Sequence, residues 1–575
     1  MMTKKYSLSL LVASLMLVSC SESQAPPEHY DTIIAGGTVY DGLGGTPIIA
    51  DIGIRDDRIA VIGDLSQAKA DSTVDAAGKA VSPGFVNMLS WAVTSLLHDG
   101  RGLSDLKQGV TLEVFGEGSS LGPLDDEGKK FWSHDLYRDQ TYKVTWNTLG
   151  GYLEHLENKG VSPNVASFVG ATTIRNNQLG AENRAPNEEE LEAMKAEVAF
   201  AMEEGAMGLG SSLIYAPAFY AKTDELIALA KVVGRYDGMY ISHMRSEGNR
   251  FLEALDELIT IAREGGVAAE VYHLKAAGKG NWPKMDQAIA KIEAARTEGL
   301  KITADMYTYQ AGATGLDAAM PPWVQEGGYN AWVTRLKDPK IRAQVKLEMQ
   351  TPTDDWENLM IAAGADGMLF AGFKNPELRH LAGKRLSEIA AERGQEPEDT
   401  AIDLVIEDGS RVGTIYFLMS VDNMYKQAVL PWLSFGSDSA AYDPLLDAPF
   451  GNPHPRGYGN FARVLGLFVR EEQLMPLEEA IRKLTHLPAT NLKIRERGSL
   501  QVGNYADVVI FDPDTISDHS TFEVPHALST GVEHVWVNGG HVIDAGEHTG
   551  AMPGRVVRGP GWTGWQAKQA QLAAE

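Results

Sequence analysis

The pattern of hydrophobic and polar positions changes twice along the chain. Residues 30–80 and 495–560 contain short apolar or alternating runs between Gly-rich turns, which is typical of antiparallel strands. The long segment between them instead combines strand-like apolar runs with amphipathic helical patterns. Two β segments on either side of an α/β body predict one small β-sandwich built from both chain ends.

The central segment contains eight candidate parallel strands. They are expected at residues 80–86, 111–115, 165–169, 207–211, 239–242, 269–273, 302–305 and 433–436. Amphipathic helices are expected between several of them, at residues 188–204, 224–236, 251–264 and 284–298. This alternation favours an α/β fold, a closed (β/α)8 TIM barrel over residues 81–494. The long gap before the last strand predicts an insertion at about residues 320–430, placed to cover the barrel mouth.

The N-terminus has a pattern of its own. Two lysines precede an apolar run over residues 8–18, which is too short to span a bilayer stably. The run ends Leu17-Val18-Ser19-Cys20, which resembles the bacterial lipobox. The resemblance implies a signal peptide at residues 1–19, a lipidated Cys20, a tether at residues 20–29 and an exported lipoprotein facing the periplasm, at the outer membrane. The alternative is an ordinary signal peptide with an incidental cysteine.

Charge and cysteine content narrow the possible chemistry. The formal net charge of −26 disfavours nucleic-acid binding, because phosphate recognition needs clustered Lys and Arg. Cys20 is the only cysteine, so the body of the chain has no disulfide, no cysteine metal ligand and no thiol nucleophile. A metal ion would therefore have to be bound by His, Asp or Glu.

Polar side chains follow several of the predicted barrel strands. Catalytic groups of TIM barrels lie at the carboxyl ends of the strands, where this chain has Glu117, His243, His273 and Asp438. Two imidazoles and one carboxylate with an open fourth position are typical of a catalytic zinc site. Asp438 would take a proton from metal-activated water and return it to a leaving nitrogen. The alternative, hydrogen-bonded structural histidines, stays open on this pattern alone.

Short motifs spread over residues 30–561 resemble the N-acyl-D-amino-acid deacylase (D-aminoacylase) family of the amidohydrolase superfamily. They include Leu213-Ile214-Tyr215-Ala216-Pro217, Ser242-His243-Met244-Arg245, His273-Leu274-Lys275-Ala276-Ala277-Gly278, Gly436-Ser437-Asp438 and His454-Pro455-Arg456-Gly457-Tyr458-Gly459. The resemblance implies the same barrel and β-sandwich, with His243 and His273 as metal ligands and Asp438 as the catalytic aspartate. It also implies five substrate contacts, at Tyr215, Arg245, Lys275, Tyr307 and Arg456. Cationic side chains suit the free carboxylate of an N-acyl amino acid.

Two departures from the family pattern affect the metal site. The superfamily usually has His-x-His after the first barrel strand, where this chain has Leu89 and Trp91. The family also has a cysteine ligand where this chain has Glu117. One divalent ion bound by Glu117, His243 and His273 is therefore expected. Zinc is favoured, although a carboxylate in place of a thiolate makes manganese or iron more acceptable.

These features together predict a metal-dependent amide hydrolase that deacylates N-acyl-D-amino acids. The predicted partner is a small N-acylated amino acid or dipeptide, with no nucleic acid and with membrane contact only through Cys20. A D-amino-acid dipeptidase or a cyclic-amide hydrolase is the alternative with the same chemistry. A catalytically inactive ligand-binding lipoprotein is the alternative from another class, and the retained polar residues speak against it.

Overall fold

The computed structural model describes residues 28–134 and 141–565. Cys20 and the predicted signal peptide lie outside the described residues, so the lipobox interpretation stays a prediction. Within the described ranges, no helix combines the length and the apolar composition that a membrane span requires.

Eight parallel strand positions form a closed barrel. The strands are β6 (Phe85–Asn87), β7 (Val110–Phe115), β8 (Asn164–Ser167) with its continuation β9 (Val169–Gly170), β10 (Gly208–Ser212), β11 (Met239–His243), β12 (Ala268–Val271), β13 (Ile302–Met306) and β17 (Leu433–Phe435). They pair in this order through two parallel sheets. The last strand meets the first, because Asp438 N donates to Leu89 O at 2.8 Å and Met88 N donates to Phe435 O at 3.4 Å. The predicted TIM barrel is confirmed.

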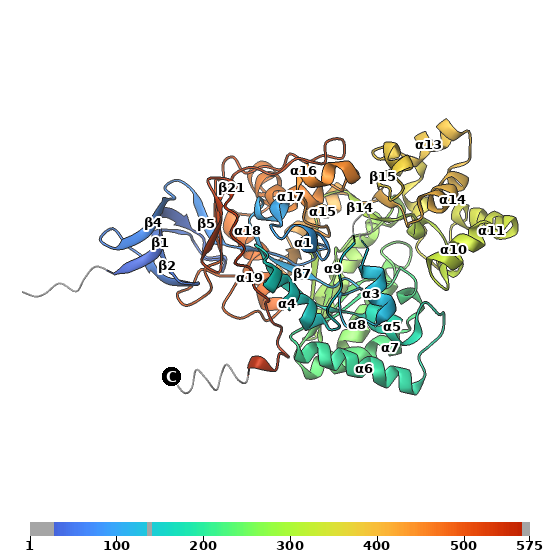
Figure 1. The fold of residues 1–575 in the computed structure, drawn as a ribbon, viewed down its shortest axis with the longest axis horizontal. Helices are drawn as coiled ribbons and strands as arrows, with labels where there is room; N and C mark the ends of the chain where they lie inside the picture. The colour runs from blue at the N-terminus through green and yellow to red at the C-terminus, as the bar shows by residue number, and fades with distance from the viewer. Residues whose placement is uncertain (1–27, 135–140, 566–575) are drawn as a thin grey trace, which may run out of the picture.

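Amphipathic helices pack around the barrel. Four of them match predicted segments: α6 (Glu188–Glu203), α7 (Thr223–Arg235), α8 (Phe251–Gly265) and α9 (Met285–Thr297). Helix α6 begins at a capping box, in which Asn187 and Glu190 each accept the other's backbone N–H. Helix α8 buries its Leu and Ile residues toward the barrel and ends at Gly266, whose φ is +66°. Figure 1 shows α6, α7 and α8 close together below the barrel.

The shorter helices complete the shell. They are α1 (Ser95–His98), α2 (Leu103–Leu106), α3 (Asp126–Trp132), α4 (Leu149–Lys159), α5 (Ala171–Leu179), α15 (Val421–Ala428), α16 (Pro444–Asp447), α17 (Arg456–Arg463), α18 (Leu477–Leu484) and α19 (His486–Asn491). Helix α12 (Leu359–Ala363) belongs to the insertion between β13 and β17.

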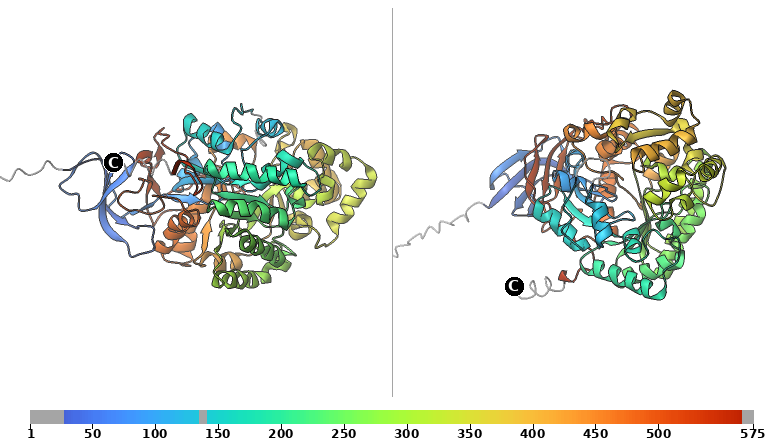
Figure 2. Two further views of the ribbon diagram at one scale, coloured as in Figure 1. Left: turned by 90° about the horizontal axis from the view of Figure 1, so that it is seen from below. Right: turned by 45° about the vertical axis from the view of Figure 1, so that its right-hand side comes forward.

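The two chain ends form one nine-stranded sheet, which we call the β domain. The N-terminal end supplies β1 (His29–Val39), β2 (Ile48–Arg55), β3 (Arg58–Gly63), β4 (Lys69–Asp75) and β5 (Ala80–Pro83), and the C-terminal end supplies β18 (Val508–Phe511), β19 (Val532–Val537), β20 (Gly540–Asp544) and β21 (Glu547–His548). Antiparallel pairing of β5 with β18 joins the two ends. Figure 2 shows the blue and brown strands side by side. The prediction of a β unit built from both ends is confirmed.

The single strand predicted at residues 80–86 is wrong, because the chain changes sheets within it. β5 belongs to the β domain, and β6 begins the barrel. Gly84 lies between them, and a Cβ at that position would come within 2.0 Å of Thr111 Oγ1. The predicted strand thus contains a boundary between two sheets, at a glycine that packs closely against β7.

The insertion between β13 and β17 forms a separate layer. It contains the antiparallel strands β14 (Ala311–Gly315), β16 (Gly413–Phe417) and β15 (Met368–Gly372), with the helices α10 (Tyr329–Leu336), α11 (Pro339–Gln350), α13 (Leu386–Arg393) and α14 (Pro397–Asp408). Figure 1 shows it in yellow, at the opposite end of the molecule from the N-terminal strands. It contacts the carboxyl ends of the barrel strands, since Glu357 Oε2 accepts the backbone N–H groups of Glu247 and Gly248.

Candidate active site

Three predicted ligand side chains meet at the carboxyl ends of β7, β11 and β12. Glu117 Oε1 lies 3.2 Å from His243 Nδ1 and 3.0 Å from His273 Nε2. All three residues are buried. Glu117 is positioned by a tight turn after β7, in which Gly116 has a φ of +110° and a Cβ would come within 2.5 Å of Phe168 O. The local backbone therefore directs one carboxylate toward two imidazoles.

This arrangement fits a divalent metal ion. Ligand atoms of a tetrahedral zinc site lie about 3.3 Å apart, because each bond is about 2.0–2.1 Å long. The separations of 3.0 and 3.2 Å are close to that value. Burial alone would raise the pKa of Glu117, but hydrogen bonds from His243 and His273 hold it well below its usual range. Glu117 is therefore an ionised carboxylate, as a metal ligand must be.

Glu247 lies behind both histidines and was missed by the sequence analysis. Its Oε1 is 3.0 Å from His273 Nδ1 and 2.6 Å from Lys275 Nζ, and its Oε2 is 3.7 Å from His243 Nε2. Burial would raise the pKa of Glu247, but Lys275 and then the two histidines hold it well below its usual range. Metal-binding histidines commonly donate their second ring N–H to a carboxylate, which fixes the ring orientation. The sequence offered one signal for Glu247: it is a carboxylate only four residues after the predicted ligand His243.

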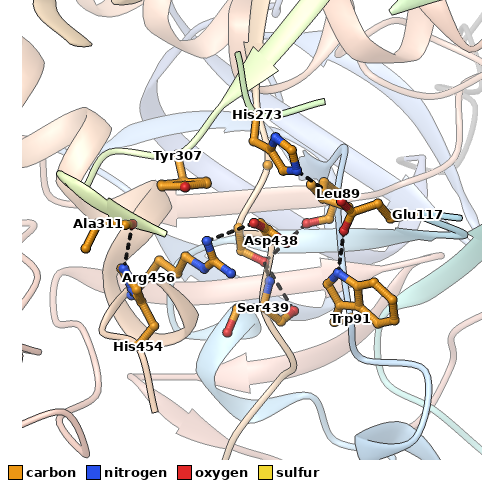
Figure 3. A network of polar contacts seen from close by, with 12 residues as sticks. Leu89, Trp91, Glu117, His273, Tyr307, Ala311, Asp438, Ser439, His454 and Arg456 are labelled. Carbon is orange, nitrogen blue, oxygen red and sulfur yellow. Dashed lines mark hydrogen bonds and ion pairs between the residues drawn. The ribbon is translucent and has the colours of Figure 1, made fainter. Parts of the chain in front are cut away.

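Asp438 lies next to the ligand cluster and is paired with Arg456. Arg456 Nη1 is 2.8 Å from Asp438 Oδ2, and Figure 3 shows Asp438 between Arg456 and the Glu117 side of the site. Burial raises the pKa of Asp438, and the nearby charge of Arg456 opposes that shift. A carboxylate with a raised pKa is a better proton acceptor, as a general base must be.

Four of the five predicted substrate contacts surround this cluster. The ring of Tyr215 is 5.3 Å from that of His243, and the Arg456 guanidinium is 4.6 Å from the ring centre of Tyr307. Lys275 Nζ lies 5.7 Å from the same ring centre. Two cationic groups and two tyrosines thus line the side of the site next to Asp438 and His243.

Arg245 has a different environment. Its guanidinium donates to both carboxylate oxygens of Glu257, at 2.8 and 2.9 Å, and to the backbone oxygens of Phe219 and Ala221. These bonds attach the end of β11 to α8. They give Arg245 a structural role, and its assignment as a substrate ligand stays a prediction.

Trp91 occupies one of the positions where the family pattern has histidines. Its indole Nε1 donates to Glu117 Oε2 at 2.7 Å, and Figure 3 shows this bond on the side of Glu117 away from His273. Leu89 is fully buried, and its backbone oxygen accepts the N–H of Asp438. One oxygen of Glu117 therefore faces the histidines, while the other is bound by Trp91.

The fold and the site together define a class of protein. A TIM barrel with a carboxylate–imidazole cluster and an adjacent aspartate at the carboxyl ends of its strands is the architecture of metal-assisted hydrolases. Comparison with known proteins agrees with this class. Residues 433–543 match the sequence model of the amidohydrolase family.

Relatives of known function match nearly the whole chain. The D-aminoacylase of Alcaligenes xylosoxydans xylosoxydans is 32% identical over 536 residues, covering 93% of this chain and 99% of the relative. The N-acyl-D-glutamate deacylase of the same organism is 32% identical over 92% of this chain and 97% of its own length. The crystal structure of N-acyl-D-glutamate deacylase from Bordetella bronchiseptica, complexed with zinc and a phosphonate inhibitor, has a TM-score of 0.77 at 30% identity, covering 92% of this chain and 100% of that one.

The chain therefore belongs to the N-acyl-D-amino-acid deacylase family of the amidohydrolases. The predicted resemblance is confirmed, and so is the prediction of a hydrolase acting on carbon–nitrogen bonds other than peptide bonds. The dipeptidase, cyclic-amide and inactive-lipoprotein alternatives are not favoured.

Proposed function

We propose that this protein hydrolyses the amide bond of N-acyl-D-amino acids, using one zinc ion bound by Glu117, His243 and His273. The observation that carries the proposal is the convergence of these three side chains beside Asp438, with ligand-atom separations of 3.0 and 3.2 Å. The related D-aminoacylase and N-acyl-D-glutamate deacylase support the substrate class. The zinc-containing N-acyl-D-glutamate deacylase structure supports the choice of ion.

The residues divide the reaction between them. The ion, when bound, supplies a Lewis acid that acidifies a water molecule and polarises the amide carbonyl. Asp438 accepts a proton from the attacking water and then donates it to the departing nitrogen, which is too basic to leave as an anion. Arg456 holds the Asp438 carboxylate in place through their 2.8 Å contact.

Substrate recognition falls to the cationic side of the site. Lys275 and Arg456 are buried, and Arg456 Nε has no hydrogen-bond partner among the described residues. A free carboxylate on the amino-acid moiety would provide charge-assisted acceptors for these donors. This preference for an anionic substrate is the feature that separates deacylation of amino acids from hydrolysis of a neutral cyclic amide.

The site is built for a single ion. Leu89 offers no ligand atom, and the Trp91 indole donates a hydrogen bond but has no lone pair to give a metal. Trp91 also binds Glu117 Oε2, which a second ion would otherwise share. Crystals of the zinc-loaded protein should show one anomalous zinc signal between Glu117, His243 and His273, and two signals in this site would contradict this part of the proposal.

A hydrolysis screen tests the proposed activity. Purified protein is assayed on paired N-acyl-D- and N-acyl-L-amino acids, dipeptides and cyclic amides, with the Asp438→Asn variant as the control for contaminating enzymes. Turnover of N-acyl-D-amino acids that is lost in the variant supports the proposal. Turnover restricted to dipeptides or cyclic amides would contradict it.

We propose further that the protein is exported and anchored to the membrane, facing the periplasm, through lipidation of Cys20. The support is the apolar run over residues 8–18 followed by Leu17-Val18-Ser19-Cys20. Replacing Cys20 with Ala should release the protein from the membrane fraction. Retention of the variant in that fraction at high salt would contradict the anchor.

A further inference from the structure

A second group of metal-binding side chains lies in the β domain, on the hairpin formed by β19 and β20. Trp536 pairs with His541 and Val535 pairs with Ile543, so Val542 is an extra residue and forms a β-bulge. In a regular strand, His541 and Asp544 would point to opposite faces, because they are three residues apart. The bulge shifts the alternation by one position. Both side chains therefore lie on the face of β19 that carries His534 and Trp536.

The three polar side chains on this face, which we call the hairpin cluster, have the spacing of metal ligands. His534 Nδ1 lies 3.2 Å from His541 Nε2 and 3.3 Å from Asp544 Oδ1. One ligand atom from each of the three residues lies within 4.8 Å of the others. These separations match the distance of about 3.3 Å between neighbouring ligand atoms of a tetrahedral zinc site.

The rings are held in place before any ion binds. His541 stacks on the buried ring of Trp536, with 4.2 Å between ring centres and an angle of 7°. The His534 ring lies 5.8 Å from Trp536 at an angle of 23°. Two imidazoles fixed against one indole lose little side-chain entropy on binding a ligand.

One backbone group also approaches a ligand atom of the hairpin cluster. The backbone N–H of Ala545 approaches His534 Nδ1 at 3.4 Å. A hydrogen bond of that length is weak and offers little competition to an ion.

We propose that His534, His541 and Asp544 bind a divalent transition-metal ion at a site separate from the active site. Two nitrogen ligands and one carboxylate suit zinc, copper or nickel. The Asp544 side chain is 60% exposed, so water would complete the coordination. The ion would link β19 to β20 across the bulge and take no part in hydrolysis.

Zinc titration of the catalytically loaded enzyme tests the site. Protein is loaded with one zinc ion, freed of excess metal and titrated with further zinc by calorimetry. The wild type should bind one additional ion, and Asp544→Asn or His541→Ala should weaken that step at least about tenfold, since even outer-shell changes cost 10–100-fold. The matched control is His29→Ala. His29 pairs with Asp71 at 2.9 Å on the same domain without a second imidazole, so its loss should not change the additional step.

The outcomes separate this inference from the proposed function. Retention of the first ion in the hairpin variants shows that the active site is intact, whatever the substrate proves to be. An anomalous zinc signal between the three side chains in crystals soaked with zinc would support the site directly. Equal zinc uptake by the wild type, Asp544→Asn and His541→Ala would overturn it, as would the absence of a second binding step in the wild type.

Discussion

The catalytic cluster and the hairpin cluster use the same donor types, two imidazoles and one carboxylate, at nearly the same spacing. They differ in what surrounds those donors. Glu117, His243 and His273 are buried, and Glu247 and Trp91 hold them from behind. His534, His541 and Asp544 lie on a half-exposed face with an indole beneath them.

Two imidazoles and one carboxylate therefore do not by themselves make a catalytic site. Catalysis needs an acid–base group and substrate-binding residues beside the ligands. Among the described residues, the barrel site has candidates for both, with Asp438 proposed as the acid–base group and Lys275 and Arg456 proposed to bind the substrate. A low-dielectric surrounding also strengthens every interaction with a charged substrate. The hairpin cluster has the chemistry of binding alone.

Loss of a ligand should produce the largest effect. His273→Ala removes one of the three donors and should abolish both turnover and the active-site ion, leaving at most the ion of the hairpin cluster. His29→Ala, a surface histidine of the β domain, should change neither. Turnover and elemental analysis on the same preparations measure both quantities. The same zinc content in His273→Ala as in the wild type would contradict the ligand assignment and remove the basis for comparing the two clusters.

Loss of the acid–base group should separate turnover from ion content. Asp438→Asn keeps the shape of the side chain but removes the proton acceptor, so turnover should fall by about 10²–10⁴-fold. Zinc content should stay at the wild-type level, because Asp438 is not among the three ligands. A variant with near-normal turnover, or one that loses its ion as fully as His273→Ala, would show that Asp438 has another role.

Loss of the Glu247 charge, which lies behind the two histidine ligands, should have an intermediate effect on zinc binding. Glu247→Gln removes the charge that faces both imidazoles and Lys275. Zinc affinity should fall by about 10–100-fold, and excess zinc should restore much of the turnover. Competition with a chelator measures the affinity. An unchanged affinity would mean that Glu247 serves only to bind Lys275.

The smallest effect is expected at Trp91. Trp91→Phe keeps the ring but removes the N–H that donates to Glu117 Oε2. Zinc affinity should fall by about tenfold, at the lower end of the range for outer-shell changes, because one bond to one ligand is lost. Competition with a chelator measures this affinity, and an unchanged value would show that the bond from Trp91 does not support Glu117.

The double variant Leu89→His with Trp91→His should gain a second ion in the active site. Elemental analysis in the Asp544→Asn background, which weakens the hairpin site, measures this gain. One ion in that background would show that Leu89 and Trp91 do not set the number of ions in the active site.

Much of the architecture followed from local patterns. Apolar runs and amphipathic segments predicted most barrel strands and helices α6 to α9 closely, because the barrel strands are buried along their length and each helix buries one face. The rule that polar residues at strand ends converge also predicted Glu117, His243, His273 and Asp438 without coordinates. Each of these residues lies at or just after the end of a strand, so its position in the sequence predicts its location at the carboxyl end of the barrel.

Other features depended on tertiary contacts that no local pattern encodes. The split between β5 and β6 depends on Gly84 meeting Thr111, and the role of Arg245 depends on Glu257 from α8. Glu247 lies in the loop after β11 and reaches His273 after β12, and Ala277 N donates to Glu247 O at 2.7 Å between these two segments.

Local sequence patterns were enough to predict the barrel, the β domain made from both chain ends and the three candidate metal ligands, because periodicity and strand-end position are properties of neighbouring residues. The tertiary structure decided what stands behind those ligands: Trp91 on Glu117, Glu247 on both histidines and Arg456 on Asp438. It also decided, through a single bulge at Val542, that His541 and Asp544 share a face with His534. Contacts between residues far apart in the chain depend on the packing of whole elements, and that packing sets which groups contact the candidate ligands and Asp438.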